Sequence, residues 1–482
     1  MSEIKKKVIS GAKWSTLAMV IVTIINTTKI FVLTRYLSKE EFGVFAIILF
    51  VLGFTELFTD MGITTAILHK QNITKRQYGT LYWFNFGISI GSYLILLAIT
   101  PMLSIFYEIP ELYWLLPLAG VNLLFLIAGK QHKTIFQKEL QFKLIGIVEI
   151  TAALMSFIFM ITLLQYRVGI EVIIFTALVQ SILLSCAFLY KGLKSYPILR
   201  VFKLKEVKDM LTIGGFQLGS QVLNYFGRDF DIMILGKLVG VEILGGYSLA
   251  KQLIKKPQFI LSSIIMRISN ALFPRFQNEK EKLNTSFLYL IEFATLIFTF
   301  VFFYSFVMSE ELMVLFYGAK YILDSPYLKW FSILILIRSI LSLNYSLVVA
   351  KGKTNYDFYW NLANALVTII VVYAIAKNVS VIWVIKGMCI LSGLMLILGW
   401  FFFVKRMSSV SFFIYFQILF KNIAVGSIAS GILIFLRERL VIEHLILELI
   451  VNLFIFVVFF GLFQWVVNGR MIKTLSKKLS SE

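Results

Sequence analysis

The sequence predicts an all-α, polytopic membrane protein with about 14 transmembrane helices. Of its 482 residues, 59% are hydrophobic and only 15% are charged, whereas about a quarter of a typical soluble domain is charged. Apolar runs of about 20 residues, the length that crosses roughly 30 Å of hydrocarbon as a helix, recur from near the N-terminus almost to the C-terminus. No soluble domain fits between these runs.

The predicted helices are apolar runs that end at glycine, proline or clustered charges. The first follows the basic start MSEIKKK, but it is too long for a signal peptide and no small-residue cleavage site follows it, so we expect it to be retained. Charged residues interrupt the seventh, eighth and thirteenth. In chain order the spans are 14–34, 43–67, 79–100, 112–128, 144–164, 170–190, 213–239, 243–272, 286–308, 330–350, 358–376, 379–403, 417–436 and 445–467.

Lysine and arginine in the predicted loops indicate the direction of the helices. Loops and tails on the side of the N-terminus hold 28 of these cations, and those on the opposite side hold 8. Because cytoplasmic loops carry the excess of Lys and Arg, we expect both termini in the cytoplasm. The most basic loop, KGLKSYPILRVFKLKEVKD at 191–209, links spans six and seven, and we expect a solvated segment that faces lipid headgroups.

Several classes of function are disfavoured by the sequence. The net charge of +20 is explained by basic cytoplasmic loops, without nucleic acid. Cys186 and Cys389 lie far apart in apolar segments, so neither a disulfide framework nor a CxxC metal site is expected. The motif GKT at 352–354 lacks the upstream glycine of a phosphate loop, because residue 347 is leucine. We therefore expect no metal, no cofactor and no catalytic residue.

An internal repeat appears when the chain is shifted by 202 residues, so that RYLSKEEFGVF at 35–45 aligns with KLVGVEILGGY at 237–247. The shift corresponds to six spans, an even number, so the two halves share one orientation. Repeats of this kind form two lobes that move against each other around a central site in transporters. We predict two pseudo-symmetric six-helix lobes, 1–205 and 206–404, followed by two additional helices and a cytoplasmic tail at 405–482.

Charged residues inside the predicted spans are the strongest functional signal. A basic side chain at a helix centre costs about 2.5 to 3.5 kcal/mol on the insertion scale, so ten of them facing lipid would cost roughly 25 to 35 kcal/mol. Some, such as Lys237 and Lys421, should extend to the interface, and the others should face a water-filled cavity or pair across helices. The ten cations are Lys29, Arg228, Lys237, Lys251, Lys255, Lys256, Arg267, Arg338, Lys386 and Lys421, and their acidic companions include Glu56, Asp60, Asp229, Asp231 and Glu292.

Spans one, two, seven and eight gather these charges into one predicted cavity. At 100° per residue, Glu56 and Asp60 share a face of the second span, and Lys251 and Lys255 share a face of the eighth. Together with Lys29 on the first span and the charges of the seventh, they describe a polar, net cationic cavity.

The acidic residues have two open roles. No ATPase domain is present, so we expect ion or voltage gradients to drive any transport, with Glu56, Asp60, Asp229 and Asp231 as candidates for coupling or gating. The same residues are equally suited to be salt-bridge partners of the cavity cations. The shift of 202 residues places Asp231 at the position of Lys29, and we hypothesise that these two pair in one state of the cycle.

A set of motifs extends from residue 11 to about 355. They are GAKWS at 11–15, RYLSKEEFGVFA at 35–46, FTDMGITTAILHK at 58–70, LNYFGRDFDIMILGKLVG at 223–240, GGYSLAKQLIKKP at 245–257, LFPRF at 272–276, LFYGAKYILDSPYLKWFSIL at 315–334 and VVAKGKTN at 348–355. As a set they resemble the polysaccharide transporter family. It belongs to the multidrug, oligosaccharidyl-lipid and polysaccharide export superfamily, with Wzx-type flippases and the lipid II flippase as relatives.

The resemblance implies a flippase in the bacterial cytoplasmic (inner) membrane. Its substrate would be an undecaprenyl-diphosphate-linked oligosaccharide, moved to the outer leaflet by alternating access for export of capsule, O-antigen or similar polysaccharide. A cationic cavity of low dielectric suits the anionic diphosphate. The implied partners are the lipid-linked glycan, membrane lipids, and polysaccharide polymerase and assembly proteins, and a monomer is expected. The headgroup contacts it implies are Lys29, Arg228, Lys251, Lys255 and Lys256.

Two other functions stay open. A cation-coupled drug or metabolite antiporter of the same superfamily would use Asp60 or Asp229 as its cation site. Its cavity should be net acidic, whereas the predicted cavity is net basic. A membrane enzyme acting on lipid-linked sugars would need room for an active-site domain, and the longest outward loop, 309–329, has only 21 residues.

Overall fold

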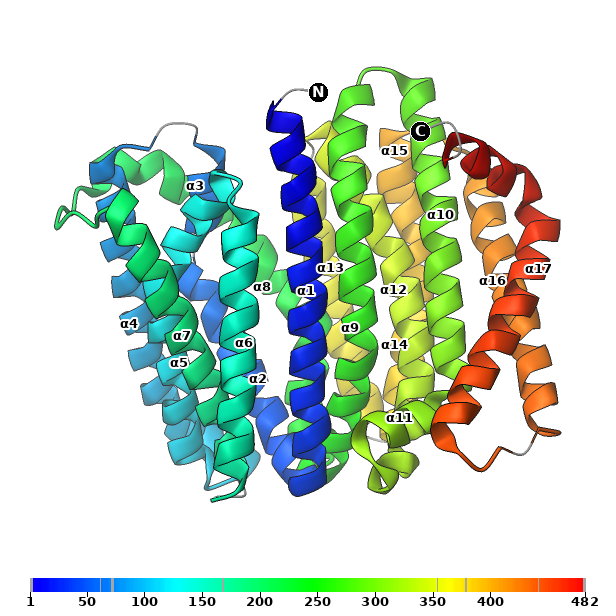
Figure 1. Ribbon diagram of the computed structural model, residues 1–482, viewed down its shortest axis with the longest axis horizontal. Helices are drawn as coiled ribbons and strands as arrows, with labels where there is room; N and C mark the ends of the chain where they lie inside the picture. The colour runs from blue at the N-terminus through cyan, green and yellow to red at the C-terminus, as the bar shows by residue number, and fades with distance from the viewer. Residues whose placement is uncertain are drawn as a thin grey trace. The chain divides into compact units, whose positions relative to one another are not determined.

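The computed structural model describes residues 3–60, 62–70, 73–166, 169–352, 354–377, 379–440 and 442–479. The chain forms two compact units, Met1–Ser248 and Leu249–Glu482, and the division between them falls inside one helix, α9. All regular elements in the described ranges are helices (Figure 1).

In the first unit, the helices form a bundle. α7 packs against α5 and α6, while α4 packs against α5, and α1 against α6 (Figure 1). The elements are α1 (Glu3–Tyr36), α2 (Lys39–Asp60), α3 (Ile63–His69), α4 (Lys75–Tyr107), α5 (Leu112–Lys138), α6 (Phe142–Leu164), α7 (Glu171–Ser195), η1 (Leu204–Val207), α8 (Lys208–Leu238) and the first two turns of α9 (Val241–Leu272).

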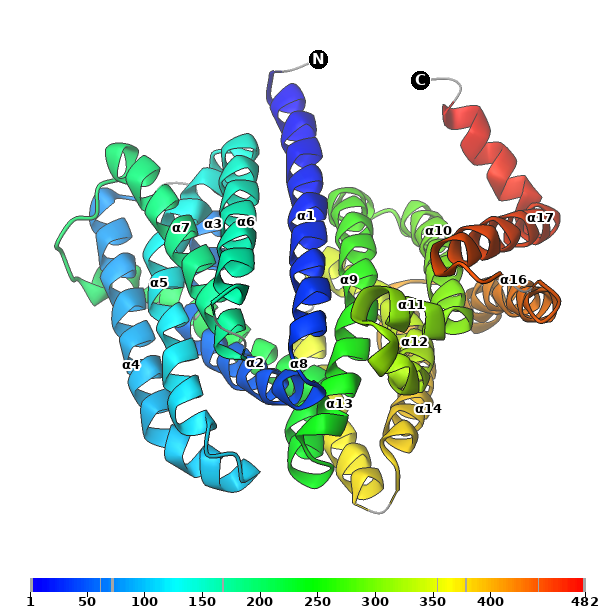
Figure 2. The ribbon, with the colours of Figure 1, turned by 60° about the horizontal axis from the view of Figure 1, so that its bottom comes forward.

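The helices of the second unit pack in an order like that of the first unit. α12 packs against α10 and α14, α13 packs against α14, and the pair α16 and α17 flanks α10 (Figure 2). Its elements after α9 are η2 (Phe273–Phe276), α10 (Lys280–Val307), α11 (Ser309–Tyr317), η3 (Ala319–Asp324), α12 (Ser325–Lys351), α13 (Thr354–Ala376), α14 (Val381–Gly399), the π-helical turn η4 (Trp400–Val404), α15 (Lys405–Met407), α16 (Phe412–Arg437) and α17 (Leu445–Leu479).

Twelve helices among the described residues are long and apolar enough to cross a membrane. The two long helices outside this set are α8 and α9, of 31 and 32 residues. They correspond to the seventh and eighth predicted spans, which charges interrupt. The all-α, multi-pass architecture is confirmed, while the number fourteen stays a prediction.

One predicted span, 43–67, is wrong in its extent. α2 ends at Asp60, and a separate short helix, α3, begins at Ile63. Gly62 stands between them with φ of 68°, a left-handed conformation that glycine adopts without strain. Because Gly62 lies within a long apolar run, hydropathy alone did not reveal the break.

The helix bounds agree with the repeat. α1 ends at Tyr36 and α8 at Leu238, and α2 begins at Lys39 and α9 at Val241, so both pairs are 202 residues apart. Farther along, α6 and its counterpart α13 both have 23 residues, but they begin 212 residues apart, at Phe142 and Thr354, and not 202. The extra residues lie between α10 and α12, where the second half contains α11 and η3.

The two copies of the repeated motif meet inside the first unit, where α2 and α9 begin. Gly43 of α2 faces the backbone carbonyl of Val241, and Gly245 of α9 faces the carbonyl of Lys39. A Cβ atom on either glycine would collide with that oxygen, so the close approach requires glycine. Because the shift equates Gly43 with Gly245 and Lys39 with Val241, the contact has approximate two-fold symmetry.

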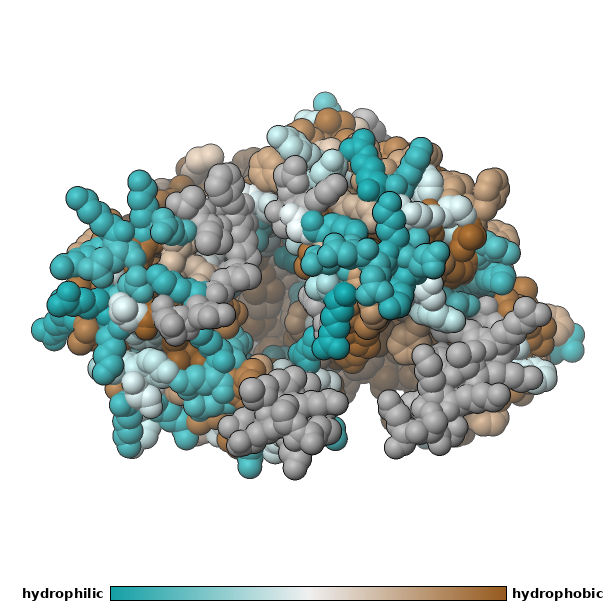
Figure 3. Space-filling model, turned by 90° about the horizontal axis from the view of Figure 1, so that it is seen from above, coloured by the Kyte–Doolittle hydropathy of each residue, from teal (hydrophilic) through white to brown (hydrophobic). Residues whose placement is uncertain are grey.

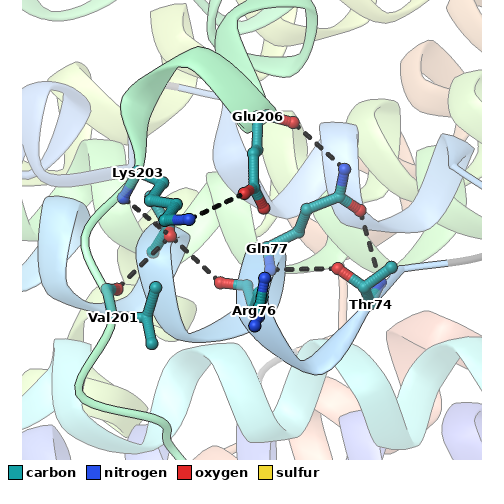
Figure 4. A network of polar contacts seen from close by, with 7 residues as sticks. Thr74, Arg76, Gln77, Val201, Lys203 and Glu206 are labelled. Carbon is teal, nitrogen blue, oxygen red and sulfur yellow. Dashed lines mark hydrogen bonds and ion pairs between the residues drawn. The ribbon is translucent and has the colours of Figure 1, made fainter.

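The basic linker between α7 and α8, residues 196–207, is bound to the first turns of α4 (Figure 4). Thr80 Oγ1 accepts a hydrogen bond from the backbone N–H of Lys203 at 3.2 Å, and Gln77 Nε2 donates to the Glu206 carbonyl at 3.0 Å. Gln77 also completes a capping box with Thr74 at the start of α4. The linker is thus fixed by side chains of one helix end.

Farther along α4, Trp83 Nε1 donates to the carbonyl of Leu199 at 3.1 Å. Gly79 lies against the same residue, and a Cβ atom there would come within 2.5 Å of the Leu199 oxygen. Hydrophilic side chains crowd this end of the first unit (Figure 3), as expected for a surface in water and headgroups. The exposed cations of the linker are Arg200, Lys203 and Lys205.

Candidate functional site

Lys29 is a buried cation about two turns before the end of α1. Its side chain is 6% exposed, and Nζ donates hydrogen bonds to Ser156 Oγ at 2.5 Å and to Gln180 Oε1 at 2.8 Å. Ser156 lies on α6 and Gln180 on α7, so three helices surround one ammonium group. Both acceptors are neutral, and no carboxylate of the described residues pairs with Lys29.

About three turns from this lysine, small residues bring α1 and α6 together. Gly146 on α6 faces Ala18 on α1, and a Cβ atom on Gly146 would lie 2.9 Å from the Ala18 Cβ. Ser156 is fully buried, and its hydroxyl also lies 3.3 Å from Gln180 Oε1. In such low-dielectric surroundings an ammonium group attracts anions strongly.

Arg228 and Asp229 form an ion pair on α8. Arg228 Nε lies 2.6 Å from Asp229 Oδ2, and the arginine side chain is 56% exposed while that of Asp229 is mostly buried. The guanidinium group also lies over the ring of Tyr225, whose hydroxyl donates to the Phe50 carbonyl of α2 at 2.6 Å. Tyr225 therefore fixes this part of α8 against α2 and positions the arginine.

Asp231 is almost completely buried one turn farther along α8. The hydroxyl of Tyr247, near the start of α9, donates a hydrogen bond to its carboxylate. Lys29 is held by its own partners on α6 and α7. The hypothesised pair of Lys29 and Asp231 is therefore not formed in this conformation.

Glu56 and Asp60, expected on one face of α2, lie in different environments. Asp60 Oδ1 accepts a hydrogen bond from Thr64 at 2.6 Å and lies 3.5 Å from Lys130 Nζ. It thereby links α2 to α3 and α5. Glu56 is exposed and makes no hydrogen bond or ion pair with the described residues. Its carboxylate is the more accessible of the two to a solvent cation.

α9 carries three lysines within two turns of the second unit. Lys251 is 2% exposed and Lys255 is half-buried. Lys256 has a buried Nζ without a hydrogen-bond partner in the described part of the chain. Pro257 follows directly, but α9 continues through it to Leu272, so the proline does not end the helix.

Lys237 lies in the last turn of α8. Its Nζ is 2.7 Å from Glu108 Oε1, in the turn after α4. The hydrogen bond from Lys237 lowers the pKa of the exposed Glu108 carboxyl below its ordinary value. This agrees with the expectation that Lys237 reaches the membrane edge.

Two further cations inside the spans of the second unit serve packing. Lys386 Nζ lies 4.2 Å from the centroid of the Trp383 ring and 4.8 Å from that of Trp330. Arg338 Nε lies 3.5 Å from Ser392 Oγ. Cation–π contact accounts for Lys386 without a ligand.

The neutral partners of the charged residues were missed by sequence reasoning. Ser156, Gln180 and Tyr247 each leave one signal, a polar side chain in an apolar helix. The same signal marks ordinary packing between transmembrane helices. Only the three-dimensional structure distinguishes a polar residue that binds a buried charge from one that packs two helices together.

The chain was compared with known proteins. The family described as polysaccharide biosynthesis protein matches residues 32–326. The teichuronic acid biosynthesis protein TuaB of Bacillus subtilis (strain 168) is 27% identical over 441 residues, which cover 90% of each chain. The lipopolysaccharide biosynthesis protein WzxC of Escherichia coli (strain K12) is 26% identical over 409 residues, covering 85% of this chain and 83% of the relative.

Solved structures share the fold. The lipid II flippase MurJ in an inward closed conformation has a TM-score of 0.75 at 15% identity, with 95% of this chain and 99% of that chain covered. An inward-facing multidrug resistance transporter of the MATE family, in the MOP superfamily, has a TM-score of 0.63 at 15% identity, covering 80% of this chain and 95% of that chain. Both neighbours are helical transporters.

Proposed function

This chain belongs to the polysaccharide biosynthesis protein family, and on that premise we propose that it is a flippase for an undecaprenyl-diphosphate-linked oligosaccharide. It would move the lipid-linked unit across the bacterial cytoplasmic membrane by alternating access, for export of surface polysaccharide. The family membership agrees with the resemblance of its motifs, and the relatives named above serve teichuronic acid and lipopolysaccharide biosynthesis. The protein is a transporter rather than an enzyme.

The observation that carries this proposal is the buried ammonium group of Lys29, whose hydrogen-bond partners among the described residues are all neutral. A cavity for cationic drugs would be expected to place a carboxylate there. A diphosphate brings negative charge to such a site and gains from its low dielectric. Lys251 on α9 adds a second cation that is almost fully buried.

We assign two roles to the charged residues as part of the proposal. The cations bind the diphosphate headgroup, because phosphate is recognised by basic groups held in place by a scaffold. The acids couple transport to an ion or voltage gradient, or pair with the cations between transport steps. The headgroup contacts are Lys29, Arg228, Lys251, Lys255 and Lys256, and the coupling or gating residues are Glu56, Asp60, Asp229 and Asp231.

The proposal extends to organisation in the membrane. Residues 1–205 and 206–404 form the two lobes, and 405–482 supply two further helices and a tail. Both termini lie in the cytoplasm, supported by the excess of cations on that side. The protein works as a monomer alongside the polysaccharide polymerase and assembly proteins.

The test is complementation of a bacterial strain that lacks its own oligosaccharide flippase. Expression of this chain should restore surface glycan and remove the lipid-linked unit that accumulates on the inner leaflet. Lys29→Gln should lower the restored glycan at least about tenfold, as expected for loss of one charged contact. Lys386→Gln, which removes a lysine held by two tryptophans, should leave restoration intact.

The drug antiporter gives the opposite result in the same strain. Export of cationic dyes with unchanged surface glycan would refute the flippase and favour the antiporter. If Lys29→Gln and Lys386→Gln reduced the restored glycan equally, Lys29 would have no specific role in binding the headgroup.

A further inference from the structure

Three charged side chains that are not among the proposed headgroup contacts meet at one end of the second unit. Arg437 Nε lies 3.1 Å from Glu448 Oε1, and the same guanidinium group pairs with Glu311 Oε1 through Nη2. Glu311 is in α11, Arg437 ends α16 and Glu448 is in the first turn of α17. We name these residues the 311–437–448 cluster. It lies at the end of the unit opposite the C-terminal end of α17 (Figure 1).

Each charge of the cluster complements the helix that carries it. Arg437 lies in the last turn of α16, and Glu311 and Glu448 lie in the first turns of α11 and α17. Cations at helix C-termini and anions at N-termini are favoured by the helix dipole. The cluster also joins α11 to the C-terminal pair of helices.

The charges of the cluster do not balance. Two carboxylates face one guanidinium group, which leaves one negative charge. Glu311 is only 5% exposed, and its Oε2 atom is buried without any hydrogen-bond partner. Within the described residues, Arg437 is its only partner. An anionic oxygen that is buried without a donor is strongly unfavourable.

Neighbouring groups do not supply the missing positive charge. Tyr304 on α10 donates its hydroxyl to the Leu449 carbonyl at 2.8 Å. Lys320 and Lys329 lie over the rings of Tyr321 and Phe306. The last turn of α10, η3 and the first two turns of α12 carry the ionisable groups Tyr304, Lys320, Tyr321, Asp324, Tyr327 and Lys329.

We propose that the 311–437–448 cluster binds one monovalent cation, a proton or a sodium ion, at Glu311 Oε2. Arg437 holds Oε1 and so directs Oε2 into the buried space. A bound proton or sodium ion brings the cluster to neutrality and satisfies the oxygen that has no partner. This site is separate from the lysines proposed to bind the headgroup, and it does not depend on the identity of the transported molecule.

The test measures the melting temperature of the purified full-length protein in nanodiscs across a pH series, in sodium chloride and in choline chloride at equal ionic strength. If the site holds a proton in the folded state, Tm falls as pH rises, because unfolding then releases that proton. If it holds sodium, sodium chloride raises Tm above its value in choline chloride at high pH. Absence of both dependences in the wild type overturns the proposal.

Glu311→Gln distinguishes a cation site from a simple ion pair. It removes the unbalanced charge and keeps the shape, so the dependence on pH or sodium should be lost and Tm at high pH should equal or exceed that of the wild type. A mere ion pair predicts a lower Tm at every pH, with the wild-type dependence retained, and that result overturns the proposal. Glu448→Gln, which leaves Glu311 paired to Arg437, should also lose the dependence. Glu310→Gln, at the exposed neighbouring position, should match the wild type.

Discussion

At the scale of single residues, Lys29 is unfavourable for folding. Placing a lysine at the centre of a transmembrane helix costs about 2.5 to 3.5 kcal/mol. Hydrogen bonds between transmembrane helices return on average only about 0.6 kcal/mol each, so those to Ser156 and Gln180 do not offset this cost, and no carboxylate of the described residues adds to them. A charge kept under these conditions is expected to serve ligand binding rather than stability.

The first prediction follows from this imbalance. Lys29→Met should leave the protein as stable or stabilise it by about 1 to 4 kcal/mol, because apolar replacement of a buried charge is often neutral or favourable. Transport should nevertheless fall at least about tenfold. Tm and complementation of the flippase-deficient strain measure the two effects. Loss of stability together with transport would instead mark Lys29 as a structural residue. Lys133→Met, which breaks the ion pair between Lys133 on α5 and Glu149 on α6, should leave transport unchanged.

At the scale of helices, glycines decide which backbones come into contact. Gly43 and Gly245 allow α2 and α9 to cross at their first turns. Gly79 allows the linker to lie on α4. These contacts join carbonyl groups to positions without side chains, so even one methyl group disturbs them.

The second prediction concerns the crossing of α2 and α9. Gly43→Ala and Gly245→Ala should each destabilise the protein by about 2 kcal/mol or more, since the new Cβ atom meets a backbone oxygen. Gly393→Ala in α14 has nothing within 4 Å of the new atom. It should stabilise by about 0.5 to 1 kcal/mol through helix propensity. Thermal denaturation in detergent checks all three, and equal behaviour of the three variants contradicts the tight crossing.

The third prediction concerns the linker. Gly79→Ala should displace the segment near Leu199 and expose it to trypsin at Arg200, Lys203 and Lys205. Cleavage there should become at least about tenfold faster, since a local opening of about 1.4 kcal/mol suffices. Gly87→Ala, in the same helix with open space around it, is the matched control. An unchanged cleavage rate in Gly79→Ala would show that the linker is held by other contacts.

The sequence predicted what depends on local composition and missed what depends on distant contacts. The apolar runs located the helices, and the charges within them supplied the candidate site residues, which stay a prediction, because the cost of lipid exposure is a property of each segment. The partners of Lys29 lie 127 and 151 positions away, and no local pattern specifies which helices meet. The contacts of the linker to α4 were missed for the same reason, since they join residues more than 100 positions apart.

At the scale of the whole molecule, the two halves repeat in backbone but not in charge. The position of Lys29 in the first half is occupied by Asp231 in the second, and both side chains are buried. Lys29 is bound by α6 and α7, whereas Asp231 is bound by Tyr247 of α9. These opposite charges at equivalent positions are the basis of the pair that we hypothesise for a second conformation of the cycle.

The fourth prediction tests that contact. Lys29→Asp and Asp231→Lys should each reduce transport at least about tenfold, because each places two like charges near one another in the paired state. The double variant should recover most of the activity, measured as restored surface glycan. Lys29→Asp combined with Asp229→Lys should not recover. Failure of the first double variant to exceed either single variant rejects the pairing.

The crossing of α2 and α9 bears on the origin of the protein. Gly43 meets the residue equivalent to Lys39, and Gly245 meets Lys39 itself, so both sides of the contact are built from the same positions of the repeat. Symmetric homodimers are built in this self-complementary way. An ancestral chain of half this length would already have carried both surfaces. Duplication and fusion of its gene would then have joined an interface that two separate copies could form.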